Sequence, residues 1–254
     1  MSKKCIWCLK EELEVTFLTK AHTIPKSLGG QNYNLNVCDS CNEYFGKRLY
    51  KFYSIEGALK ETFNVTRFKL LQALKPKRKI GEFKSVFFNL KIKKNHLNLI
   101  VKDTFRFDYN SQNQLCRAFK RGLYKLYFEE LNRQKNIGYE STFDIIREFS
   151  RYDLDDLPVY YFNRSVGVLF MTGTEVETPI LFFDRMNYLY SNEYFAEIEF
   201  LGHVFGFPIN KYTPTDFDNY LHSSIQLKQQ FFKGFKEIKR LTDIDLLLSI
   251  MNEK

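Results

Sequence analysis

The stretch that decides the fold is residues 5–46, CIWCLKEELEVTFLTKAHTIPKSLGGQNYNLNVCDSCNEYFG. It contains two Cys-x-x-Cys pairs, Cys5 with Cys8 and Cys38 with Cys41. A pair with this spacing lets two thiolates reach one metal ion, so two pairs in a reducing compartment indicate a tetrahedral four-cysteine zinc site rather than disulfides. Because four sulfur ligands leave no open coordination position, we expect this zinc to be structural.

The segment between the two pairs is longer than the usual short zinc finger, so we expect it to fold and to carry the function. Alternation around Val15 and Phe17 favours a short strand that leads to His22. Proline and glycine then predict a loop over residues 25–30. The segment after the loop predicts a strand at 35–37 and a helix over 39–53, with Asp39 and Ser40 as candidate N-caps.

Residues of this segment have side chains suited to phosphodiester hydrolysis. That reaction needs a base for the attacking water, a cation on the phosphate oxygens and stabilisation of the leaving oxygen. His22, at the end of its predicted strand, is a candidate base in its neutral form. Asn36 or Asn34 could fix the tautomer of His22, and Asn42 could ligate a hard cation through its side-chain oxygen.

Three segments, CIWC, AHTIPKSLGG and NVCDSCNEYFG, together resemble the HNH endonuclease superfamily. The resemblance is to its ββα-metal fold, in the branch whose zinc knuckles flank the motif, and it covers about the first 50 residues. It implies His22 as general base, Asn36 as the asparagine that orients it, with Asn34 as the competing choice, and Asn42 as ligand of Mg²⁺ or another catalytic divalent cation. It also implies DNA as the substrate and suggests restriction or antiviral defence as the setting.

The sequence departs from the family pattern at the metal-binding positions. Many members carry Asp, Glu or His directly before the catalytic histidine, where this chain has Ala21. Four residues after Asn42, where some members have a histidine, it has Gly46. Glu43, Glu14 or a backbone oxygen would then have to help hold the cation. The alternative function is therefore a non-catalytic zinc protein that binds nucleic acid or acts as an interaction subunit.

We predict an α+β fold in two domains, the zinc-stapled HNH module at 1–53 and a larger mixed domain at 54–254. The second domain would recognise substrate, bind a partner or regulatory ligand, or control the nuclease, because it contains no further catalytic cluster of carboxylates or histidines. Its predicted elements are a helical or mixed segment at 54–75, a hairpin at 85–103, helices at 114–131 and 141–152, strands between 158 and 207, and a helix at 236–251. A capping box of Ser141 and Asp144 is expected to begin the helix at 141–152.

The net charge of +8 and the pI of about 9.1 fit a polyanionic partner such as DNA. Lys47, Arg48 and Lys51 are the candidate phosphate contacts. The other basic clusters are expected to be solvated faces, unless they converge with these three residues into a phosphate track: Lys75/Lys77/Arg78/Lys79, Lys91/Lys93/Lys94 and Arg117/Lys120/Arg121/Lys125.

The remaining features give no further site. We expect Cys116 to be a buried thiol, and His96, His203 and His222 to have no chemical role. The sequence contains no uninterrupted apolar stretch of about 20 residues, which a membrane helix needs, and its first residues lack the apolar stretch of a signal peptide. A cytoplasmic protein without a membrane partner is therefore expected.

Overall fold

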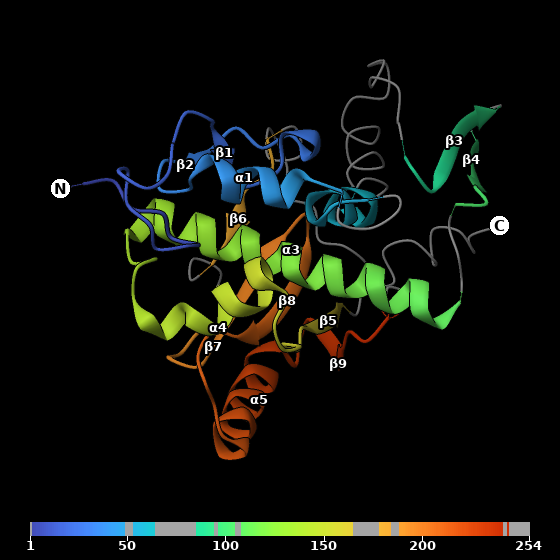
Figure 1. The fold of residues 1–254 in the computed structure, drawn as a ribbon. Helices are drawn as coiled ribbons and strands as arrows, with labels where there is room; N and C mark the ends of the chain where they lie inside the picture. The colour runs from blue at the N-terminus through green and yellow to red at the C-terminus, as the bar shows by residue number, and fades with distance from the viewer. Residues whose placement is uncertain are drawn as a thin grey trace.

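The computed structural model describes residues 2–48, 53–63, 85–93, 96–104, 108–164, 178–183, 188–240 and 243. The long helix α3 (Tyr109–Lys135) crosses the middle of the described structure (Figure 1). In this view the N-terminal elements lie above α3, and most of a five-stranded sheet lies behind and below it. The chain therefore mixes helices and strands, as the predicted α+β class requires.

The N-terminal elements follow the predicted order of strand, loop, strand and helix. Strand β1 (Ala21–His22) pairs antiparallel with β2 (Tyr33–Asn34), which sets His22 opposite Tyr33. The 3-10 turn Lys26–Leu28 lies in the loop, and its C-cap Gly29 has a φ of 98°, in the left-handed region that glycine favours. Helix α1 (Asp39–Gly46) follows.

Three details of this prediction were wrong. The second strand ends at Asn34 rather than spanning 35–37, because the Asn36 carbonyl accepts a hydrogen bond from the Ile6 N–H of the first knuckle. Residues 15–17 form no strand. Helix α1 ends at Gly46, since Lys47 already has an extended backbone, and residues 49–52 of the predicted helix lie outside the described residues.

Helix α3 confirms the helix predicted at 114–131 and extends it in both directions. The Asp108 side chain accepts a hydrogen bond from the Ser111 N–H at the N-terminus, and Asn136 ends the helix in the left-handed conformation with a φ of 54°. Apolar side chains such as Leu123 and Phe128 are buried along it. The helix is thus a central element of the core.

The helical segment predicted at 141–152 is composite. A 3-10 turn (Ser141–Phe143) leads into α4 (Asp144–Ile146), and a π-helical turn follows at Arg147–Arg151. The predicted capping box is absent: the N-cap of the first turn is Glu140 rather than Ser141, no side chain caps it, and Asp144 pairs with Arg147 at 2.5 Å. The segment is therefore helical as predicted, but it begins differently.

The antiparallel sheet has the strand order β6-β7-β8-β5-β9. Its members are β5 (Tyr160–Arg164), β6 (Leu181–Phe182), β7 (Phe195–Phe200), β8 (His203–Pro208) and β9 (Phe232–Glu237). Residues 236–237, predicted to begin a helix, instead extend β9, which pairs with β5; residues 244–251 of that helix lie outside the described residues. Strands β3 (Phe88–Lys93) and β4 (His96–Val101) form the predicted separate hairpin.

Helix α5 (Pro214–Lys228) was not predicted from the sequence. Its Tyr220 packs against Phe195 of the sheet, with the two ring centres 4.3 Å apart in a stacked arrangement. Thr213 and Asp216 form a capping box at its start. Residues 55–63 are helical, and residues 64–84, with the rest of the helical segment and the basic cluster at 75–79, lie outside the described residues.

The main hydrophobic core spans the predicted boundary between residues 53 and 54. It joins Trp7 and Phe45 from the N-terminal segment to Phe128 of α3, and the Trp7 ring lies 4.8 Å from Phe45 and 4.9 Å from Phe128. The division into two domains stays a prediction. Among the described helices, none is long and apolar enough to cross a membrane.

Candidate functional site

The structure brings the four predicted zinc ligands together. The sulfur atoms of Cys5, Cys8, Cys38 and Cys41 all lie within 4.8 Å of one another, and the Cys8 and Cys38 sulfurs are 3.7 Å apart. Zinc–sulfur bonds of about 2.3 Å in a tetrahedron place the sulfurs about 3.8 Å apart. The four thiols are thus a possible zinc site with the expected donor set.

Crowding and burial perturb these thiols strongly. A hydrogen bond from Cys41, supported by backbone N–H groups and opposed by burial, lowers the pKa of Cys5 to about 5. Burial raises the pKa of Cys8 to about 11. Four adjacent sulfurs cannot all ionise without a cation among them, so a bound divalent metal fits this cluster.

His22 lies at the end of β1 with its side chain half-buried. Its Nδ1 is 3.2 Å from the backbone carbonyl oxygen of Lys20, and its ring lies 6.4 Å from the ring of Tyr33. The backbone oxygen of His22 accepts a hydrogen bond of 2.9 Å from the Lys125 ammonium on α3. Hydrogen bonds therefore hold both the main chain and the side chain of His22.

The two candidate asparagines have different surroundings. Asn34 is buried; its amide donates to the Glu129 carbonyl at 2.8 Å, and its side-chain oxygen accepts from the Asn36 N–H at 2.8 Å. The side-chain oxygen of Asn36 lies 3.5 Å from the Asn132 amide of α3. Neither side chain has a hydrogen bond to His22 within the described part of the chain. Asn34 is the one that holds the loop after β2.

Asn42 and Asp39 connect α1 to the segment before β1. The Asn42 amide donates to the Thr19 hydroxyl at 3.0 Å, three residues before His22. Asp39 accepts hydrogen bonds from Thr16, Thr19 and the Leu18 N–H, and these bonds outweigh the effect of burial and hold the pKa of Asp39 well below its usual range. Asp39 therefore organises this loop and does not cap α1 through its side chain.

A buried ion pair lies directly beneath β1. Lys125 contacts Glu129 at 2.9 Å and Glu56 at 3.1 Å, and the Trp7 indole donates to Glu129 at 2.9 Å. Burial would lower the pKa of Lys125, but the two carboxylates raise it above its ordinary value. Through these contacts, the Lys125 ammonium and its carboxylate partners connect the first Cys-x-x-Cys pair, β1 and α3.

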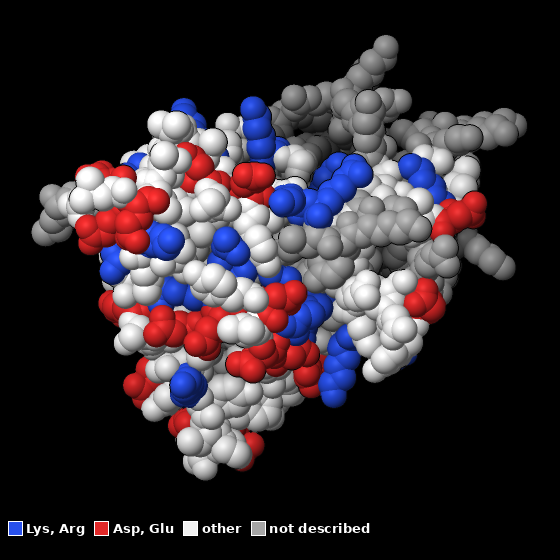
Figure 2. Space-filling view, in the orientation of Figure 1, with Lys and Arg blue, Asp and Glu red and all other residues white. Residues whose placement is uncertain are grey.

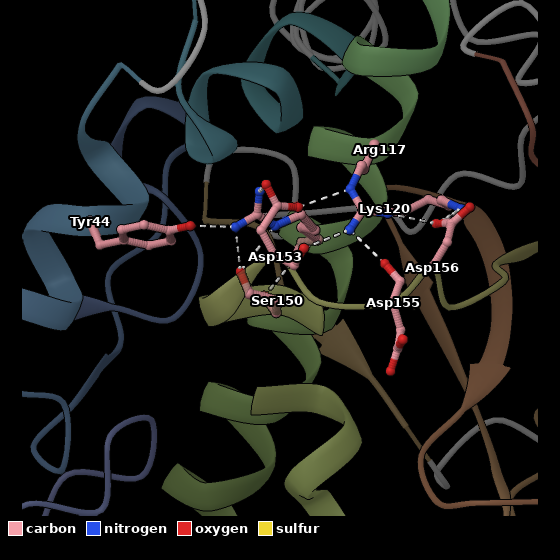
Figure 3. A network of polar contacts seen from close by, with 8 residues as sticks. Tyr44, Arg117, Lys120, Ser150, Asp153, Asp155 and Asp156 are labelled. Carbon is pink, nitrogen blue, oxygen red and sulfur yellow. Dashed lines mark hydrogen bonds and ion pairs between the residues drawn. The ribbon is translucent and has the colours of Figure 1, made fainter. Parts of the chain in front are cut away.

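The α3 cations were expected on a solvated face, and that expectation was wrong. Arg121 and Lys125 are fully buried, and Lys120 is nearly so. Arg121 binds Asp153 at 3.0 Å and donates to the Tyr44 hydroxyl of α1 at 2.6 Å, as Figure 3 shows from close by. Arg117 and Lys120 bind the acidic turn at 153–156 in the same network. Carboxylates of the same chain therefore pair with the basic side chains that would otherwise be available to bind phosphates.

Of the predicted phosphate contacts, Lys47 and Arg48 are exposed just beyond α1, and Lys51 lies outside the described residues. On the face drawn in Figure 2, basic and acidic side chains are interspersed over the described surface. Cys116 is buried, as expected. His203 is buried with a 3.0 Å contact to the Tyr161 hydroxyl, and His222 is exposed on α5. His96 begins β4.

Several residues at this site were missed from the sequence, namely Trp7, Glu56, Glu129, Arg147 and Arg151, and the structural roles of Arg121 and Lys125 were not predicted. The single tryptophan inside the first knuckle was a usable signal, because an indole N–H in a core needs an acceptor. The others had none: their contacts to other elements are remote in sequence, and local pairs such as Lys125 with Glu129 have the spacing of a solvated helix face.

Comparison with known proteins identifies the N-terminal segment. Residues 5–54 match the family model for HNH endonuclease, which covers about a fifth of the chain. Neither the curated proteins nor the solved structures contain a match to this chain.

Proposed function

We propose, from the premise that residues 5–54 form an HNH endonuclease module, that this chain is a metal-dependent endonuclease that hydrolyses phosphodiester bonds in DNA with His22 as general base. The observation that carries the proposal is the hydrogen bond between His22 Nδ1 and the Lys20 carbonyl, within a segment that matches the family. The proposal extends the family match to a reaction and to the residues that perform it.

This hydrogen bond selects the form of His22 that can act as a base. A carbonyl oxygen only accepts, so Nδ1 must carry the proton and the lone pair is on Nε2. His22 is only half-buried, so the proposal needs its Nε2 to be the atom that faces the attacking water. Lys125 holds the His22 main chain from beneath, which limits movement of the imidazole as it takes the proton.

Asn42 is the proposed ligand for the catalytic divalent cation. Its amide nitrogen is engaged by Thr19, which leaves the side-chain oxygen as the donor for a hard cation. Ala21 offers no ligand atom, so water and substrate phosphate would complete the coordination, as Mg²⁺ favours. Such a cation would supply charge stabilisation at the phosphate and at the leaving oxygen.

Asn34, rather than Asn36, is the better candidate for the asparagine that supports His22. The Asn34 side chain fixes the turn after β2 through the Asn36 N–H and anchors it to the Glu129 carbonyl of α3. Since β2 pairs with β1, this anchoring acts on the strand that holds His22. Asn36 remains the alternative, and its effect on His22 would be weaker.

The test is metal-dependent nicking of plasmid DNA by the purified full chain, compared with His22→Ala and with His222→Ala as matched control. His222 is exposed on α5 and bonds Gln226, so its loss should leave cleavage unchanged. His22→Ala should lose about 10²–10⁴-fold in rate with unchanged zinc content, because general-base catalysis contributes about that much. Cleavage by His22→Ala at the wild-type rate would refute the base assignment.

A second function is favoured by one observation. The side chain before His22 is the buried methyl group of Ala21, where a metal ligand is common in the family. If the wild-type protein cleaves neither DNA nor RNA with any divalent cation but binds them with strong salt dependence, a non-catalytic nucleic-acid-binding protein replaces the nuclease.

A further inference from the structure

We propose that Arg151, which lies far outside the family match, is part of the zinc site, where its guanidinium donates to the Cys41 sulfur and offsets the negative charge of the four thiolates. The inference rests on the zinc site and not on nuclease activity. It assigns a role in the metal site to a residue of the larger segment, which was predicted from the sequence to recognise substrate, bind a partner or regulatory ligand, or control the nuclease.

The contacts of Arg151 point at the second knuckle. Its Nε lies 3.4 Å from the Cys41 sulfur, and its guanidinium lies 3.9 Å from the centre of the Tyr44 ring, one turn later on α1. Hydrogen bonds to sulfur are longer than those to oxygen, so an N···S distance of 3.4 Å is normal for a hydrogen bond to a thiolate. The planar guanidinium can donate at its edge while its face stacks on an aromatic ring, which a lysine ammonium cannot do.

The negative charge of a zinc ion with four thiolates explains why a cationic side chain is needed beside the cysteines. Zn²⁺ with four thiolates carries a net charge of −2, and Cys5, Cys38 and Cys41 are at most 1% exposed. A buried charge without compensation is costly. Within the described part of the chain, Arg151 makes no ion pair with a carboxylate, so its positive charge is directed at the sulfur cluster.

Arg147, one turn earlier, provides a useful contrast. Its Nε donates to the Ile6 carbonyl at 2.7 Å, inside the first knuckle, but its charge is already matched by Asp144 at 2.5 Å. Arg147 therefore binds the backbone between Cys5 and Cys8, whereas Arg151 donates a hydrogen bond to a sulfur of the second pair. A single helical turn, Arg147–Arg151, contacts both halves of the metal site.

The test measures metal binding in the full chain with three variants: Arg151→Gln, Arg151→Lys and the control Arg133→Gln. Arg133 is on the surface end of α3 and pairs with Glu130, remote in sequence from the knuckles. Zinc affinity is measured by competition with a chromogenic chelator, and the thiolate-to-metal charge-transfer band is recorded after replacement of zinc by Co²⁺.

Arg151→Gln should weaken zinc binding about 10–100-fold, as is typical for loss of a hydrogen bond to a ligand, and should shift the Co²⁺ band. Arg151→Lys should lose less, because it keeps the charge, and it tests the idea even if the glutamine variant does not fold. Arg133→Gln should match the wild type.

Unchanged zinc affinity and an unchanged Co²⁺ band in both Arg151 variants would overturn the inference. So would lower thermal stability with unchanged zinc affinity, because that result would mean that Arg151 only packs on Tyr44. A protein that responds as expected but cleaves no DNA would uphold this inference while the proposed nuclease function fails.

Discussion

Glu129 should make the stability of this protein fall as the pH rises. The side chain is fully buried between the Trp7 indole and the Lys125 ammonium. Burial raises its pKa to about 7 from an ordinary value of 4.5, although both neighbours oppose the change. The folded protein therefore binds this proton more tightly than the unfolded chain, so the contribution is fully present below pH 4.5 and is lost as the pH rises through 7.

The size of the effect follows from these two pKa values. Proton linkage with 4.5 in the unfolded chain and 7 in the folded protein lowers the free energy of unfolding by about 1 kcal/mol between pH 6 and pH 8. Glu129→Gln has no such proton to lose. The free-energy difference between wild type and variant should therefore change by about 1 kcal/mol over this range, in favour of the variant at higher pH.

The assay is urea unfolding with saturating zinc, followed by the fluorescence of Trp7, the only tryptophan, which touches Glu129 itself. Contributions from all other groups are common to the two proteins and cancel in the difference. The control is Glu130→Gln: hydrogen bonds from Arg133 and Gln134 overcome burial and lower the pKa of Glu130, so this carboxylate stays ionised from pH 6 to 8. Parallel pH profiles for wild type and Glu129→Gln would refute the reasoning, because Glu129 would then be ionised throughout.

Three further predictions concern the site. Cys38→Ser should release the zinc and unfold the N-terminal segment, which metal analysis and circular dichroism would detect; a well-folded protein that never held zinc would contradict this. Asn42→Ala should reduce cleavage, with part of the loss recovered at higher divalent cation concentration, and equal loss at every concentration would exclude a ligand role. Asn34→Ala should destabilise the fold by about 1–3 kcal/mol, because buried partners lose their hydrogen bonds, whereas Asn36→Ala should be milder in urea unfolding.

The zinc cluster and the order of the first elements could be predicted from the sequence because their determinants are local. Spacing alone indicates which cysteines share a metal, and proline and glycine mark the loop after His22. The strand at 35–37 was misplaced by two residues because Asn36 pairs with Ile6, a contact between segments that periodicity does not detect. Helix α5 went unrecognised, although Thr213-Pro214 with Asp216 is a local start signal.

The charged residues of α3 were misread for a different reason. Lys125 and Arg121 have the polar spacing of an exposed helix face, and only their partners show that they are internal. Those partners, Glu56 and Asp153, come from segments before and after the helix. A buried ion pair leaves no local signature, because each member alone has the composition of a solvated surface.

Burial of these cations also changes the meaning of the net charge. The +8 is a formal count in which every Lys, Arg, Asp and Glu is ionised, so the members of internal pairs such as Lys228 with Glu197 cancel within it. The excess must belong to other lysines and arginines. Among the candidates, Lys47 and Arg48 are exposed and directly follow the helix that carries Asn42. Asn42 is in the first turn of α1, and a rise of about 1.5 Å per residue puts Lys47 about 8 Å further along the helix. A DNA strand could span that distance, so we expect binding and cleavage to share α1 rather than the surface of α3.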